Sequence, residues 1–180
     1  MKPASAVAGV FKAILISTLL MIIVGSVWNI YIIFETQKKI EAVGDSMKAE
    51  LSKNNSILYE SIDDFGEQLK AIDATSVGAY VFKNIEIVKK DSNGADLPIV
   101  IVENVGADQP VKLSIPDENT YYGKVQGEYG EFVTIRLNYD INVSILSYNK
   151  AEKGLTDIRE RTSTANTSFD YTTPCLRYMK

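Results

Sequence analysis

Two pairs of adjacent carboxylates are the residues of this sequence best suited to acid–base chemistry. Asp63-Asp64 lies in a segment with helical spacing, and Asp117-Glu118 follows Pro116 in a turn-like segment. Paired carboxylates act as general acid and general base when both side chains converge on one substrate. Neighbouring residues on a helix point apart, however, and carboxylates in a turn are commonly solvated. We therefore expect neither pair to be catalytic.

One short segment resembles the start of a calcium-binding loop. The residues DSNGAD, 91–96, place oxygen-bearing side chains at alternate positions. A complete loop also supplies a bidentate glutamate at its twelfth position, and the twelfth residue counted from Asp91 is Val102. Because Asn-Gly is a strong hairpin signal, we expect a hairpin turn here and no metal site.

The composition excludes several classes of enzyme. Histidine is absent and Cys175 is the only cysteine, which removes histidine-based general bases, Cys-His pairs, the usual zinc sites and any disulfide within the chain. Cys175 is either a small packed residue or a thiol for another chain. The net charge is −4, with no strongly basic segment, so nucleic acid is not an expected partner. We predict a non-enzymatic protein without catalytic residues, cofactor, metal or small-molecule substrate.

An uncharged run of 22 residues, 13–34, lies between Lys12 and Glu35. As a helix rising about 1.5 Å per residue it would be about 33 Å long, enough to cross a hydrocarbon core of about 30 Å. We predict one transmembrane helix over 13–34, preceded by a short cytoplasmic tail, 1–12. A cleaved signal peptide is the alternative. The run continues for eight residues beyond Ser26, the best cleavage point, and this favours the anchor.

Four side chains near the far end of this run indicate how the helix is placed. Trp28 and Tyr31 carry amphipathic rings that favour the membrane–water interface, so we place them at the outer rim. Export of the larger C-terminal part is the simpler topology, which predicts a single-pass cell-membrane protein with an extracytoplasmic C-terminal domain. Asn29, with Ser26 beside it, is predicted to contact another helix, because an amide within a membrane favours a polar partner.

Residues 35–76 keep a helical spacing of apolar positions. These positions recur in steps of three and four, with one gap at Asn54-Asn55-Ser56: Ile40, Val43, Met47, Leu51, Leu58, Ile62, Phe65, Leu69 and Ile72. The pattern predicts an amphipathic stem helix that continues directly from the membrane helix, with a break or a bend at Asn54-Asn55 as an open alternative. Two heptads in each block are too few for a coiled coil, so we expect packing on a domain or on neighbouring subunits.

From about residue 79 the period changes from 3.6 to 2. Strands are predicted at 80–89, 97–105, 111–115, from 132 onward, and at 158–171. Residues 121–125 precede the glycine-containing segment 127–130. The longest alternation is VTIRLNYDINVSI, 133–145, in which every odd residue is apolar. At about 3.3 Å per residue this strand would reach about 40 Å, so its apolar face needs a long one-faced partner. We predict an α+β fold, with the long N-terminal helix (membrane span plus amphipathic stem) packed on a C-terminal antiparallel β-sheet domain, 79–180.

Four segments together form a recognisable layout: the membrane segment 12–34, the stem segment NNSILYESI at 54–62, the alternating strand 133–145 and the closing PCLRY at 174–178. This layout is similar to that of type IV pilin-like proteins, and more narrowly it resembles the pseudopilins of Gram-positive Tad-like systems. A processing site of that family would place glutamate at the fifth mature position, where this chain, counted from Gly9, has Ile14. The resemblance implies a structural or assembly subunit of a pilus-like or secretion-linked envelope apparatus, held in the membrane until it enters an extracellular filament.

A second interpretation belongs to a different functional class. The same residues fit a membrane-anchored extracytoplasmic binding or sensor module, whose β domain holds a partner outside the cell. Under the first hypothesis the expected partners are the membrane, further copies of the chain and other subunits of the envelope apparatus.

Overall fold

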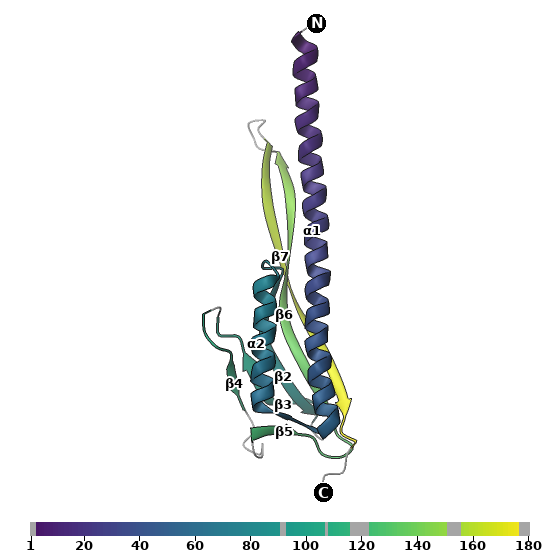
Figure 1. The fold of residues 1–180 in the computed structure, drawn as a ribbon, viewed down its shortest axis with the longest axis vertical. Coiled ribbons are helices and arrows are strands. Elements are labelled where there is room, and N and C mark those ends of the chain that lie inside the picture. The colour runs from purple at the N-terminus through teal and green to yellow at the C-terminus, as the bar shows by residue number, and fades with distance from the viewer. Residues whose placement is uncertain (1–2, 91–92, 107, 116–122, 151–155, 177–180) are drawn as a thin grey trace.

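The computed structural model describes residues 3–90, 93–106, 108–115, 123–150 and 156–176, with the backbone alone for 3–7, 145–150 and 156–161 (Figure 1). The elements in chain order are α1 Pro3–Asn54, β1 Ser56–Leu58, α2 Tyr59–Thr75, β2 Tyr80–Lys90, β3 Asp96–Glu103, β4 Lys112–Ser114, β5 Lys124–Gln126, β6 Phe132–Lys150 and β7 Thr156–Pro174. Strands β4-β3-β2-β6-β7 form a five-stranded antiparallel sheet, and β1 pairs with β5. The predicted α+β fold, a long N-terminal helix packed on an antiparallel sheet, is confirmed.

The stem predicted over 35–76 is formed by two helices, and the chain breaks between them at Asn54-Asn55. Helix α1 ends at Asn54, and Asn55 adopts a positive φ of 49°, a conformation that asparagine tolerates better than most residues. The Gly127 amide donates to the Asn55 carbonyl at 2.8 Å, which draws the chain into the β1–β5 pair. Helix α2 then runs back alongside α1 (Figure 1).

The short strand β1 changes which side chains the stem buries. Ile57 pairs with Val125 of β5 and is completely buried, whereas Leu58, which the helical pattern assigned to the apolar face, is 49% exposed. The period of a strand differs from that of a helix, so a three-residue strand inserted into the helical pattern shifts the buried face by one position.

The predicted strands exist, with ends that differ by a few residues. Strand β2 pairs with β6 from Lys89↔Val133 to Tyr80↔Ile141, and β6 pairs with β7 along its whole length, to Lys150↔Thr156. Strands β2 and β3 form the predicted hairpin, and Gly94 has the positive φ of a turn residue. The turns predicted at 116–119 and 150–157 lie largely outside the described residues.

The two helices cover one face of the sheet, and the core lies between them and the strands. Helix α1 packs on β6 and β7, and α2 packs on β2 and β3. The odd residues Val133, Ile135, Leu137 and Tyr139 of β6 are fully buried beneath the helices. The prediction that the apolar face of this strand packs on the stem is confirmed, but β6 lies on α1, whereas the carboxyl half of the stem, α2, covers β2 and β3. Val143 is exposed, because the sheet continues beyond the covered part.

The candidate membrane anchor and its junction with the sheet

The N-terminal half of α1 presents apolar side chains to its surroundings on all sides. Phe11 and Met21 are 68% and 77% exposed, and no residue of the most apolar 18-residue stretch is buried. Soluble domains rarely leave so large an apolar surface uncovered. Within the described part of the chain, α1 is one helix whose length and composition suffice to cross a membrane.

Polar side chains within the apolar run are satisfied in different ways. The Ser26 hydroxyl donates to the Ile22 carbonyl at 2.8 Å, and the Thr18 hydroxyl donates to the Ile14 carbonyl at 2.9 Å. Such bonds back to the preceding turn are the usual solution for hydroxyls on a membrane helix. Ser26 therefore has a partner within its own helix, and its predicted contact with a helix of another chain stays a prediction.

Trp28 and Tyr31 form an exposed aromatic pair near the end of the apolar run. Their ring centroids lie 5.8 Å apart with an angle of 33° between the planes, and both side chains are exposed. In sequence the two rings flank Asn29, which contacts Ser144 of β6, so the pair lies level with the β6–β7 hairpin. This position suits an interfacial role for the two rings, which remains a prediction.

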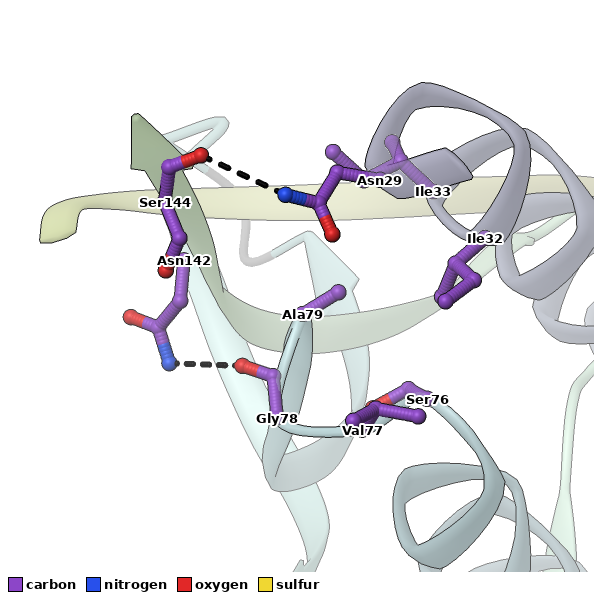
Figure 2. Close-up of a pocket in the computed structure, with 9 residues that line it drawn as sticks. All are labelled: Asn29, Ile32, Ile33, Ser76, Val77, Gly78, Ala79, Asn142 and Ser144. Carbon is purple, nitrogen blue, oxygen red and sulfur yellow. Dashed lines mark hydrogen bonds between the residues drawn. The ribbon is translucent and has the colours of Figure 1, made fainter. Parts of the chain in front are cut away.

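Asn29 reaches from α1 to the sheet (Figure 2). Its Nδ2 atom donates to the Ser144 carbonyl of β6 at 3.5 Å. A pocket of about 60 Å³, lined by Asn29, Ile32 and Ile33 of α1 and by residues 76–79, 142 and 144, separates the two elements. That is room for about two water molecules. The β domain thus contacts α1 within the segment 13–34 predicted to cross the membrane.

On the sheet side of this pocket, Asn142 joins β6 to the segment that precedes β2. Its backbone amide donates to the Ala79 carbonyl at 2.8 Å, and its side-chain amide donates to the Gly78 carbonyl at 3.0 Å. These bonds lie where β2 begins and its pairing with β6 ends, at Tyr80↔Ile141. Sequence reasoning missed the contacts of Asn142 and Ser144, which fall at polar positions of the alternating strand.

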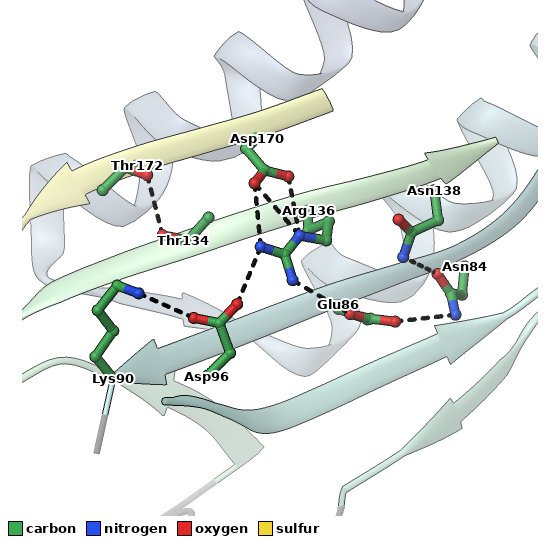
Figure 3. A network of polar contacts seen from close by, with 9 residues as sticks. All are labelled: Asn84, Glu86, Lys90, Asp96, Thr134, Arg136, Asn138, Asp170 and Thr172. Carbon is green, nitrogen blue, oxygen red and sulfur yellow. Dashed lines mark hydrogen bonds and ion pairs between the residues drawn. The ribbon is translucent and has the colours of Figure 1, made fainter. Parts of the chain in front are cut away.

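The face of the sheet turned away from the helices carries a network of ion pairs (Figure 3). Arg136 contacts Asp170 at 3.0 Å and Asp96 at 3.1 Å, and Glu86 lies 4.0 Å away. The hydrogen bond to Asp170 is the main cause of a raised pKa for Arg136, and hydrogen bonds from Lys90 and Arg136 lower the pKa of Asp96. Lys90 and Arg136 are paired here with three carboxylates, so the network links neighbouring strands and carries one more negative than positive charge.

The carboxylates considered for chemistry do not form a site within the described structure. Asp63 and Asp64 lie next to each other on α2, and Asp96, the last residue of the calcium-like segment, pairs with Lys90 and Arg136. Asp91, Asp117 and Glu118 lie outside the described residues. Among the residues described, no group of three or more histidine, cysteine, aspartate or glutamate side chains could hold a metal ion.

Cys175 is a packed residue and not an exposed thiol. Only 1% of its surface is exposed, and a Cβ added at Gly127 would overlap its Sγ atom. Burial raises the pKa of the thiol. Of the two interpretations of Cys175, the structure favours the small packed residue.

One titratable group in the core was missed by sequence reasoning. Asp73, near the end of α2, accepts a hydrogen bond from the Phe82 amide at 2.6 Å through Oδ2, while its buried Oδ1 has no partner among the described residues. Burial raises its pKa to about 6. Asp73 lies four residues after the buried Leu69, so its helical position could have indicated the burial.

Comparison with known proteins identifies no relative of this chain. No protein-family model matches it, and no curated protein or solved structure is significantly similar to it. The resemblance to pilin-like proteins therefore remains a hypothesis that rests on this chain's own residues.

Proposed function

We propose that this chain is a non-enzymatic, single-pass membrane protein with its β domain on the extracytoplasmic side. The observation that carries the proposal is the uncovered apolar half of α1, where the most apolar window has none of its residues buried. Side chains such as Met21 gain stability when lipid or protein replaces water around them. The larger domain is the part expected outside.

We propose further that the chain is a structural or assembly subunit of a pilus-like or secretion-linked envelope apparatus. Helix α1 runs through 52 residues from the apolar segment to the far end of the sheet, so no flexible linker separates the anchor from the domain. The space at the junction, about 60 Å³, is far below the roughly 300–1,000 Å³ of ligand pockets. A domain rigidly attached to its anchor suits ordered incorporation into an assembly.

The alternative function, an anchored binding or sensor module, draws support from the outer face of the sheet. The helices leave this face uncovered, and Arg136 and Asp170 lie on it. A partner protein bound there would meet a polar surface of paired charges with one carboxylate in excess.

The anchor is tested by membrane flotation and by protease added to intact protoplasts. We expect the chain to resist carbonate extraction and to lose its β domain to external protease. A paired substitution within the apolar run, Leu19→Arg with Ile23→Arg, should release the chain from the membrane, whereas Val77→Arg, at an exposed position of the β domain, should not. Digestion only after lysis would reverse the topology.

The two roles are separated by isolating the chain from its membrane. Under the assembly hypothesis it should co-purify with further copies of itself and appear in filaments on negative-stain images. Under the sensor hypothesis it should remain in the membrane with a partner that Arg136→Glu releases. Absence of both self-association and filaments would contradict the assembly role.

A further inference from the structure

The β6–β7 hairpin lies beside the apolar segment of α1 (Figure 1). Ser144 is level with Asn29, and β6 continues for six residues beyond it to Lys150. Six strand residues span about 20 Å, the length of about thirteen helical residues. The hairpin therefore extends along α1 to the level of about residue 16, deep within the segment that the proposed function places in lipid.

This part of the hairpin is unsuited to a hydrocarbon environment. Beyond Ile141, β6 pairs with β7 alone among the described strands, so each strand has one edge of unpaired backbone groups. The sequence also places several charged residues on the described strands: Lys150, Asp157, Arg159, Glu160 and Arg161. Open sheet edges do not occur in contact with lipid, and charged residues there are strongly unfavourable.

Among the side chains that the structure describes, the hairpin beyond Asn142 makes little contact with α1. One hydrogen bond of 3.5 Å joins Asn29 to Ser144, and the pocket of about 60 Å³ lies beside it. Below this level, Asn142 is held by Gly78 and Ala79, and the buried core begins. The pairing of β6 with β2 ends at Ile141, and beyond it β6 stays paired with β7, so this part of the hairpin is joined to the rest of the sheet through its own two strands.

We propose that a lipid-inserted anchor and a docked hairpin exclude each other. While residues 13–34 lie in the bilayer, the hairpin beyond Asn142 stands away from α1. The hairpin docks, with the Asn29 amide on the Ser144 carbonyl, when lipid withdraws from that level of the helix. This inference rests on the proposed membrane anchor. It implies that the bilayer, by covering or exposing this part of α1, controls the position of the hairpin.

The test is cross-linking of Ile32→Cys/Ser144→Cys in liposomes of graded thickness, with a short bifunctional thiol reagent; both positions line the junction pocket, and Asn29 keeps its hydrogen bond to the backbone carbonyl of residue 144. A thinner bilayer covers less of the helix, so docking should become more frequent as the lipid chains shorten. We expect a yield of at most a tenth of the control's in the thickest bilayers, rising at least fivefold in the thinnest. The control pair is Thr134→Cys/Thr172→Cys, two cross-strand neighbours whose hydroxyls lie 3.0 Å apart, and its yield should not change.

Each other outcome overturns the proposal. A yield that equals the control's at every thickness means that the hairpin stays docked within lipid. The absence of cross-linking at every thickness means that it never docks. A chain that does not float with the liposomes contradicts the proposed membrane anchor itself, and the inference falls with it.

Discussion

The ring of Tyr171 lies directly against the backbone of Gly44, so that a Cβ added at Gly44 would overlap the ring. Gly44 is on the half of α1 that packs on the sheet, and Tyr171 is on β7 opposite Ile135. A glycine within a helix costs up to about 1 kcal/mol relative to alanine. Here the missing side chain lets the helix approach the edge of the sheet closely.

Gly44→Ala should therefore destabilise the β domain despite the better helix propensity of alanine. Displacement of a packed ring costs about 1–3 kcal/mol, which exceeds the propensity gain. Thermal denaturation in detergent measures the change. The control is Gly25→Ala, because a Cβ there meets nothing within 4 Å. Gly44→Ala/Tyr171→Ala should show a favourable coupling between the two sites, and strict additivity would contradict the proposed contact.

Leu137→Asp should unfold the β domain. Leu137 is fully buried beneath the helices, and an unpaired buried charge costs several kcal/mol against a total stability of about 5–15 kcal/mol. Its neighbour Arg136 faces the opposite side, so Arg136→Gln should cost about 1 kcal/mol or less, as for other exposed ion pairs. Thermal melts compare the two variants. If the two variants had the same thermal stability, the odd residues of β6 would not form a buried core.

Cys175 should be unreactive toward maleimide in the folded protein and reactive in urea. Its thiol is buried and its pKa is raised, so both access and thiolate fraction are low. Gly127→Ala places a methyl group where the sulfur lies and should increase the labelling rate. Labelling is followed by mass spectrometry. Rapid modification of the native parent chain would contradict the packing described for this residue.

Most elements of the fold were predictable because each of them has a local signal in the sequence. The alternation over 133–139 requires one apolar face, and the polar Asn54-Asn55 gap marks the point where α1 ends. Strand β1 was missed because its partner β5 is about 70 residues further along the chain. A strand of three residues is too short to show an alternating pattern of its own.

The junction with the membrane segment was not predictable for a related reason. Asn29 and Ser144 are 115 residues apart in sequence, and each was read within its own element, one as a membrane amide and the other as a polar strand position. Their contact depends on how far β6 extends past its last pair with β2, Tyr80↔Ile141. That length is set by the pairing of strands and is not visible in either segment alone. The burial of Asp73 could have been predicted, because Asp73 lies one helical turn after the buried Leu69. It was missed because the helical pattern was assigned from apolar residues alone.

Asp73 should make the stability of the β domain depend on pH. Its pKa is about 6 in the folded protein, against an ordinary value of 3.8, because of burial. Below about pH 4 the group is protonated in both states. Between about pH 4 and pH 6 the folded state keeps a proton that the unfolded chain has released, so the free energy of unfolding falls as the pH rises, and above pH 6 the loss is complete.

Asp73→Asn should remove this dependence, because its amide oxygen can still accept the Phe82 hydrogen bond without carrying a buried charge. We expect the variant to be more stable than the parent at pH 7–8, by about 1–2 kcal/mol after allowance for partial solvent screening, and to match it near pH 4. Urea denaturation at a series of pH values measures both. Asp64→Asn, at an exposed position of the same helix, is the matched control and should leave the pH profile unchanged. A variant at Asp73 whose pH profile equals the parent's would show that this carboxylate is not the buried charge that opposes folding.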